Sequence, residues 1–177
     1  MKTTALDADE YFHLALHASS VGDHHACMSY LAEVLQQQPA NARALYLRAV
    51  QYAELGLTER AVSGIEAALA IEPGLEIARF QLGLLLLDRD RREEAKEYFL
   101  RLSSSRDHVL RTFAEAMVAL AAKDSVQARE KLSLGLAQIS KDQPLAALMK
   151  RLFDHLSDGA KPVSEAAEPG NVKSLQV

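Results

Sequence analysis

Cysteine and aromatic residues are scarce in this sequence. Cys27 is the single cysteine among 177 residues, which excludes an intramolecular disulfide framework. Tryptophan is absent, and aromatic residues make up 6% of the chain whereas hydrophobic residues make up 49%. We therefore expect one soluble domain of ordinary globular composition, with a core packed mainly by alanine and leucine.

Long apolar segments and an excess of positive charge are also missing. The run Leu84–Leu87 is far too short to span a bilayer, and Met1–Asp7 lacks the apolar core of a signal peptide. The formal net charge of −4 creates no field that would attract nucleic acid or an anionic membrane. We therefore expect a cytoplasmic protein without membrane insertion and without nucleic-acid binding.

Motifs of known catalytic or cofactor chemistry do not occur. The eight glycines are dispersed along the chain and form no phosphate-binding loop. Neither a nucleophile elbow nor a paired acid–base motif is found. The sequence therefore predicts a protein that is not an enzyme and that holds no cofactor.

A repeat of 34 residues is the strongest feature that the sequence does contain. Apolar residues recur at three- and four-residue spacing almost throughout, which is the periodicity of helices. A fixed step of this size indicates stacked helical units. Three residue pairs are separated by 34 positions: Gly22 and Gly56, Cys27 and Ala61, and Pro39 and Pro73.

The periodicity predicts four pairs of helices and one last single helix. Gly22 and Gly56 lie in the first two turns, where glycine adopts a positive φ without steric cost. Asp90 and Asp124 lie in the corresponding later turns, and aspartate tolerates this conformation better than most residues. The expected helices are 8–20 with 24–37, 42–54 with 58–71, 76–88 with 91–104, 109–122 with 125–139, and 144–156.

Proline supports the predicted helix boundaries. Pro39 and Pro73 come just after the second helix of their pairs, where a residue without an N–H group ends a helix. Pro144 fits the first turn of the last helix.

This arrangement resembles the tetratricopeptide repeat (TPR), a helix–turn–helix unit of 34 residues. The first two copies match its small, turn and proline positions well, and a third has Gly83 and Ala95 but Asp90 in place of the turn glycine. A fourth copy is weaker and has one residue deleted in its turn. The resemblance implies an all-α, right-handed α-solenoid of about four TPR-like helical hairpins with a C-terminal capping helix. The matching residues of the first two copies are Ala15, Gly22, Cys27 and Pro39, and Ala49, Gly56, Ala61 and Pro73.

The chain then divides into a repeat region and two tails. The predicted repeats are 8–41, 42–75, 76–108 and 109–142, together 8–142, and the capping helix is 143–156. Residues 1–7 form an N-terminal tail. Residues 157–177 contain few large apolar side chains and are expected to be disordered in isolation.

In the family that the chain resembles, the first helix of each hairpin lines a concave face that contacts ligands. Phe12, Tyr46 and Phe80 place an aromatic ring at one position of three successive repeats, and the whole face is unusually apolar. An exposed apolar face of this kind is rare without a partner. The resemblance therefore implies a groove for an apolar peptide segment, lined by Phe12, Leu16, Arg43, Tyr46, Val50, Ile77, Phe80, Leu84, Leu87, Arg111 and Val118.

The resemblance further implies a non-enzymatic protein–protein interaction module, either an adaptor or a secretion-type chaperone. The face is similar to that of the bacterial type III secretion chaperones, which cradle apolar segments. The charged residues Asp9, Arg43, Glu54, Asp88 and Arg111 are expected to set the register of the partner. The alternative is a structural scaffold that assembles with itself, with the groove covered by the chain's own tail or by a second copy.

The basic and amide side chains that clamp a carboxylate in some members of this family are missing here. Those positions hold Phe12, Leu16, Leu47, Ile77 and Gln81. The tails of heat-shock chaperones are therefore not expected as ligands.

Histidine and cysteine cluster near the N-terminus, at His13, His17, His24, His25 and Cys27. The spacing of the first two suits a metal ion. However, the cysteine occupies the small packing position of the repeat, and two of the histidines fall in a turn that is expected to face solvent. An exposed polar end of the repeat array is the favoured interpretation, without a metal.

Overall fold

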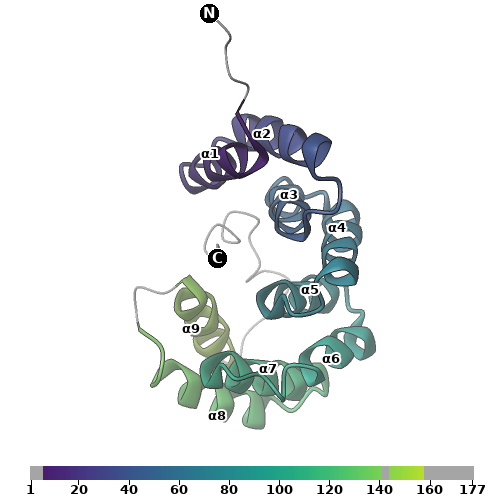
Figure 1. Cartoon of the computed structure of the whole chain (residues 1–177). Coiled ribbons are helices and arrows are strands. Elements are labelled where there is room, and N and C mark those ends of the chain that lie inside the picture. The colour runs from purple at the N-terminus through teal and green to yellow at the C-terminus, as the bar shows by residue number, and fades with distance from the viewer. Residues whose placement is uncertain (1–5, 141–143, 158–177) are drawn as a thin grey trace, which may run out of the picture. The chain divides into compact units, whose positions relative to one another are not determined.

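The computed structural model describes residues 6–140 and 144–157, which form nine α-helices and no strand (Figure 1). Consecutive helices pack as the hairpins α1–α2, α3–α4, α5–α6 and α7–α8, and α9 packs against α8. The prediction of an all-α helical repeat is confirmed. The helices are α1 (Ala8–Ser20), α2 (His24–Gln37), α3 (Ala42–Glu54), α4 (Thr58–Ile71), α5 (Glu76–Asp88), α6 (Arg92–Leu100), α7 (His108–Ala121), α8 (Ser125–Leu136) and α9 (Pro144–Ser157).

The helices belong to two compact units. The first unit contains α1 to α4 and ends at Leu75, and the second begins at Glu76 and contains α5 to α9. This division falls between the second and third of the predicted repeats. The predicted tail beyond Ser157 lies outside the described residues.

Side-chain caps explain where most of the helices begin. Asp7 accepts a hydrogen bond from the backbone N–H of Glu10 at 2.8 Å, and the Glu10 carboxylate accepts one from the N–H of Asp7 at 2.9 Å. This reciprocal capping box satisfies two backbone donors that the first turn of a helix leaves without a partner. A single side-chain oxygen caps four further helices, from Asp23, Asn41, Asp107 and Asp124.

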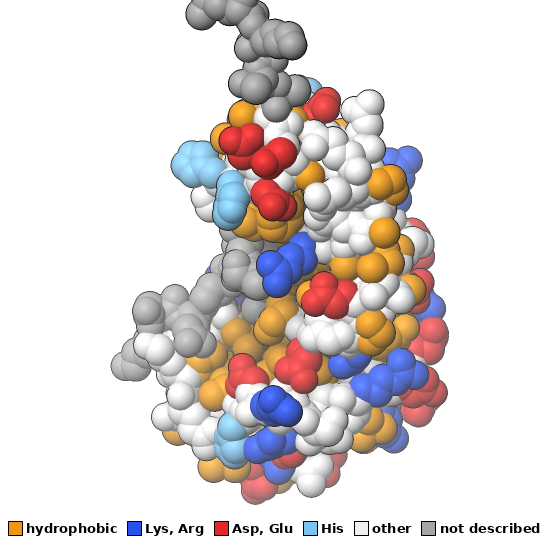
Figure 2. Space-filling view, in the orientation of Figure 1, with side chains coloured by type: hydrophobic (Ala, Val, Ile, Leu, Met, Phe, Trp, Pro, Cys, Tyr) orange, Lys and Arg blue, Asp and Glu red, His pale blue; other side chains and the backbone are white. Residues whose placement is uncertain are grey.

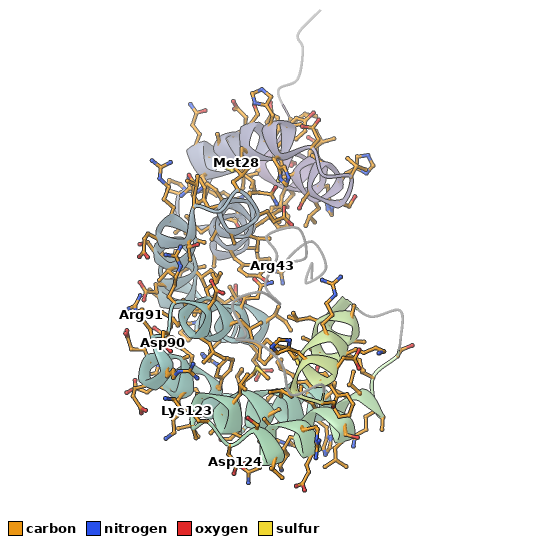
Figure 3. All side chains as sticks on the ribbon, turned by 180° about the vertical axis from the view of Figure 1, so that it is seen from behind. Met28, Arg43, Asp90, Arg91, Lys123 and Asp124 are labelled. Carbon is orange, nitrogen blue, oxygen red and sulfur yellow. The ribbon has the colours of Figure 1, made fainter. Side chains whose placement is uncertain are left out.

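The turn within each hairpin contains one residue with a positive φ. Gly22 (φ 76°) and Gly56 (φ 74°) take this conformation in the first unit, and Asp90 (φ 57°) takes it in the second, as predicted. The prediction for the fourth hairpin is wrong, because Lys123 (φ 62°) and not Asp124 adopts it. Three residues separate the two helices here as in the other hairpins, but the positive-φ residue follows Asp90 by 33 residues and not by 34, so Asp124 is the N-cap of α8 (Figure 3).

Two helices end earlier than the sequence predicts: α6 ends at Leu100 rather than at 104, and α8 at Leu136 rather than at 139. After α6, the N–H groups of Leu102 and Ser105 bond to carbonyl groups three residues earlier, which is the tighter pattern of 3₁₀ turns. This tightening buries both side chains. The Ser105 hydroxyl donates a hydrogen bond of 2.7 Å to Glu76 at the start of α5. Because α6 ends early, Ser105 lies in the α6–α7 loop, and this bond ties the loop to the α5–α6 hairpin.

Small residues allow the two helices of each hairpin to approach closely. Ala15, Ala49 and Gly83 occupy the same position in successive first helices, and all three are buried. A Cβ atom added at Gly64 of α4 would lie 2.8 Å from the Cβ of Ala49, which is too close for two carbon atoms. Ala49, one of the small residues predicted from the repeat, therefore lies where α3 and α4 approach each other closely. The equivalent positions of the second helices, Cys27, Ala61, Ala95 and Ala128, are also fully buried.

Aromatic rings fill the space beside the glycines of the second unit. Phe99 of α6 lies against Gly83, and a Cβ atom at Gly83 would come within 2.6 Å of the ring. The same ring packs edge-on against Phe80, with the centroids 5.5 Å apart. Likewise, the Phe113 ring would lie 2.5 Å from a Cβ atom at Gly135.

We expect Gly83→Ala to lower the free energy of unfolding. Overpacking of a filled core costs about 1–3 kcal/mol, which exceeds the about 1 kcal/mol that alanine gains over glycine inside a helix. The matched control is Gly74→Ala, because a Cβ atom there meets nothing within 4 Å. Urea unfolding followed by circular dichroism measures both variants. A Gly83→Ala protein as stable as the wild type would contradict the ring-to-glycine contact.

Candidate functional site

The first-helix face of the first unit consists of the predicted groove residues on α1 and α3. Phe12 and Leu16 are half-buried and pack against the core between α1, α2 and α3. Arg43 is exposed, and it lies on the side of α3 that is turned away from α4 (Figure 3). The face therefore combines two partly accessible apolar side chains with one accessible cation.

The expectation of an exposed aromatic row fails in the first unit at its second ring. The structure buries Tyr46, which is 4% exposed, and also Val50. Burial raises the pKa of the Tyr46 phenol above its usual range, because the ionised form loses its hydration. Neither side chain is open to an incoming ligand in this structure, so Phe12 and Leu16 are the accessible apolar groups of this face.

The first-helix face of the second unit comes from α5 and α7. Ile77, Leu84 and Val118 are half-buried, whereas Leu87 is buried. Phe80 is fully buried because its ring packs against Phe99 inside the α5–α6 hairpin. The third ring of the expected aromatic row is therefore a core residue and not part of an open surface.

Arg111 stabilises a loop instead of standing free to contact a partner. Its Nη1 atom donates a hydrogen bond of 2.8 Å to the carbonyl oxygen of Ser105. The Ser105 hydroxyl accepts from the N–H of Asp107 at 3.1 Å and donates to Glu76. This set of hydrogen bonds joins α5, the α6–α7 loop and α7, and it gives Arg111 a structural role that the repeat register did not predict.

A buried polar network connects three helices of the first unit. Gln51 of α3 is fully buried, and its Nε2 donates to the Ser19 hydroxyl of α1 at 2.9 Å. Its Oε1 lies 2.8 Å from Nδ1 of His24 at the start of α2. Because Oε1 can only accept a hydrogen bond, Nδ1 carries the proton. The prediction that His24 points into solvent is therefore wrong.

Glu54 also belongs to this network. Its side chain is 2% exposed, and Oε2 lies 3.3 Å from the same Nδ1 atom of His24. Glu54 is therefore not an exposed residue that sets the register of a partner, as the sequence suggested. The sequence carried one signal of this network: Gln51 interrupts an otherwise apolar stripe on α3, one turn after Leu47.

The remaining histidines and the cysteine do not converge. Cys27 is fully buried, whereas His13, His17 and His25 are exposed. Within residues 6–140 and 144–157, no group of three or more His, Cys, Asp or Glu side chains is placed to hold a metal ion. Burial, followed by the charge of Glu54, raises the pKa of the Cys27 thiol from 9.0 to about 11, although a hydrogen bond with Ser19 opposes the rise.

The surface carries charges of both signs with apolar side chains between them, and acidic and histidine side chains gather near α1 (Figure 2). Arg91 and Arg92 pair with Glu94 and Asp90 at the start of α6, so much of the charge in this segment is locally balanced.

None of the helices described here is long and apolar enough to cross a membrane.

The comparison with protein families identifies the repeat. Residues 77–106 match the model of the tetratricopeptide repeat family. These residues form a tetratricopeptide repeat. The match falls on the third predicted TPR hairpin and confirms the resemblance deduced from the sequence. No curated protein sequence matches the chain.

Solved structures of TPR proteins share the fold. PilF of Pseudomonas aeruginosa superposes with a TM-score of 0.67 and 22% identity, over 96% of this chain and 78% of that chain. MamA from Desulfovibrio magneticus RS-1 gives a TM-score of 0.62 and 15% identity, over 85% and 89%. A further MamA structure gives 0.60 and 17%, over 92% and 91%. At these identities the likeness shows the fold alone.

We expect Gln51→Leu to destabilise the first unit by about 1–3 kcal/mol, because the buried Ser19 hydroxyl and the half-buried His24 imidazole each lose a hydrogen bond to Gln51. Leucine is of similar size, so the loss does not come from a cavity. The control is Gln36→Leu, an exposed position on α2. Adding Ser19→Ala to Gln51→Leu removes the hydroxyl that has lost its bond to Gln51 and should recover part of the lost stability. Urea unfolding of the four proteins measures this, and a neutral Gln51→Leu would contradict the network.

We expect Cys27 to resist alkylation in the folded protein. The thiolate is the reactive form, and at pH 8 a thiol with a pKa of about 11 is almost wholly protonated. The folded state binds this proton more tightly than the unfolded state does. The resulting contribution to the free energy of unfolding is therefore complete below pH 9 and is lost as the pH rises towards 11. Mass spectrometry after iodoacetamide treatment, with and without urea, tests the prediction. Equal labelling in both conditions would refute it.

Proposed function

We propose that this chain is a non-enzymatic protein–protein interaction module that holds an apolar peptide segment of a partner on its first-helix faces. TPR units act in general as protein-interaction scaffolds, because stacked hairpins present an extended surface. Within this general role, we propose the narrower one of a cytoplasmic adaptor or secretion-type chaperone.

The observation that carries the proposal is the accessibility of aliphatic side chains on the first helices of both units. Leu16 on α1, and Leu84 and Val118 on α5 and α7, are each half-buried, so each has apolar surface left to cover. A ligand with apolar anchors would remove this surface from water, at roughly 25 cal/mol per Å². The aromatic rings of Tyr46 and Phe80 are buried and offer no such surface.

The register of the partner is proposed to depend on fewer charges than the sequence suggested. Arg43 and Asp9 remain exposed in the first unit, and Asp88 in the second. Glu54 and Arg111 already have partners within the fold. A ligand that fits is therefore mainly apolar, with its few charges near Arg43.

A peptide-display selection against the full chain tests the proposal. We expect the selected peptides to carry apolar anchors, and Leu16→Ala to weaken their binding about 5- to 30-fold, because the lost contact is worth about 1–2 kcal/mol. Leu14→Ala is the matched control, since Leu14 lies on the same helix, is 37% exposed and is not one of the predicted face residues. Calorimetry with one selected peptide gives the affinities.

Thermal unfolding confirms that both variants are folded before their affinities are compared. Equal affinity of the wild type, Leu16→Ala and Leu84→Ala would reject the first-helix faces as the binding surface. A self-assembling scaffold would instead show a mass in solution that rises with concentration.

A further inference from the structure

One side of α3 packs against the hairpin that precedes it in the first unit. Ala44 and Leu47 belong to the core that α1 and α2 form, and Gln51 bonds to Ser19 of α1 and His24 of α2. These three residues of α3 are at most 4% exposed. This side of a first helix is therefore the surface on which another pair of helices stacks.

The equivalent side of α1 is polar and exposed. Thirty-four residues before the three buried positions of α3 stand Glu10, His13 and His17. All three side chains are exposed, and their spacing of three and four residues places them on one stripe of the helix. We call this stripe the outer side of α1. Histidine and acidic side chains lie together near α1 in Figure 2.

His13 and His17 have the spacing of a metal-binding pair. Residues four apart on a helix have Cβ atoms about 5–6 Å apart on the same side, so their rings can point at one ion. Imidazole nitrogen binds Zn²⁺ at about 2.0–2.1 Å. Both side chains are exposed and open to an ion from solution. The exposed carboxylates of Asp9 and Glu10, about one turn earlier, add negative charge that favours a cation.

One chain supplies too few ligands for a complete site. Zn²⁺ in a structural site takes four protein ligands in a tetrahedral arrangement. Within residues 6–140 and 144–157, no group of three or more His, Cys, Asp or Glu side chains is placed to hold a metal ion. A two-fold axis brings the same residues of two molecules together, so a second copy would present the same pair. Two pairs provide four imidazole ligands.

We propose that His13 and His17 of two chains bind one Zn²⁺ ion, which joins the two molecules through the outer sides of α1. The sequence favoured a polar end without a metal, because His24 and Cys27 were counted in the same cluster. The structure buries Cys27 and bonds His24 to Gln51, so the exposed pair on α1 stands apart from them. The zinc-linked dimer goes beyond the proposed function and does not depend on it.

The mass of the full chain in solution tests the proposal. Sedimentation is measured at one protein concentration, first in EDTA and then with increasing Zn²⁺ after EDTA has been removed. We expect the mass to double and to saturate at one ion per two chains. A mass that Zn²⁺ leaves unchanged, a dimer already present in EDTA, or saturation at one ion per chain would each overturn the proposal.

Point variants identify the ligands. His17→Gln should abolish the zinc-dependent dimer, because each chain then keeps one imidazole of the pair. His25→Gln is the matched control, since His25 is also an exposed histidine of the first unit but lies on α2. Circular dichroism confirms that both variants are folded. A zinc-dependent dimer that survives His17→Gln, or one that both variants lose equally, would refute the assignment.

Co²⁺ in place of Zn²⁺ reports the geometry of the site. Four imidazoles around Co²⁺ in a tetrahedral arrangement give intense visible absorption, whereas an octahedral ion that keeps several waters absorbs weakly. We expect the intense spectrum, and the weak one would contradict a site made of four histidines.

The proposed function is tested separately, by peptide binding in EDTA. If selected peptides bind there while Zn²⁺ produces no dimer, the metal site fails and the proposed function stands. If Zn²⁺ produces the dimer while no peptide binds, the outcome is the reverse.

Discussion

The close approach of paired helices at small residues is the constraint on which this structure depends. At Gly83 and Gly135 a phenylalanine ring takes the space that a Cβ atom would occupy. Ala49 and Gly64 meet in the same way in the first unit. Because the α3–α4, α5–α6 and α7–α8 hairpins are each closed at one such contact, the other side chains of their first helices are held at fixed positions.

The same contacts determine which side chains of the first helices remain accessible. Phe80 packs against the ring that closes its hairpin, so it stabilises the fold and does not serve as an anchor. Tyr46 is also buried. The half-buried Leu16 and Leu84 keep part of their apolar surface accessible, and Arg43 is exposed. A face of this kind is suited to apolar contact, as the proposed interaction module requires.

Much of the fold could be predicted from the sequence, because helix periodicity, turn residues and caps are local signals. Gly22, Gly56 and Asp90 were predicted to adopt a positive φ, and they do so. Lys123 was missed because a single deletion moves that turn out of the 34-residue step. The roles of Glu54, His24 and Arg111 could not be predicted, since each depends on a side chain from another helix or loop. The position of a residue in the repeat predicts which face of the helix it lies on. Its exposure depends on packing against other helices and loops.

The hydrogen bonds between Ser19, Gln51 and His24 have a further consequence for α3. Apolar contacts tolerate a small rotation of one helix against another, because dispersion has little directional preference. The hydrogen bonds of 2.8 and 2.9 Å that the Gln51 amide forms with His24 and Ser19 are directional, so they do not tolerate such a rotation. They set the rotation of α3 about its own axis. The direction in which Arg43 projects, two turns towards the N-terminus, is therefore determined by a polar network that never touches it.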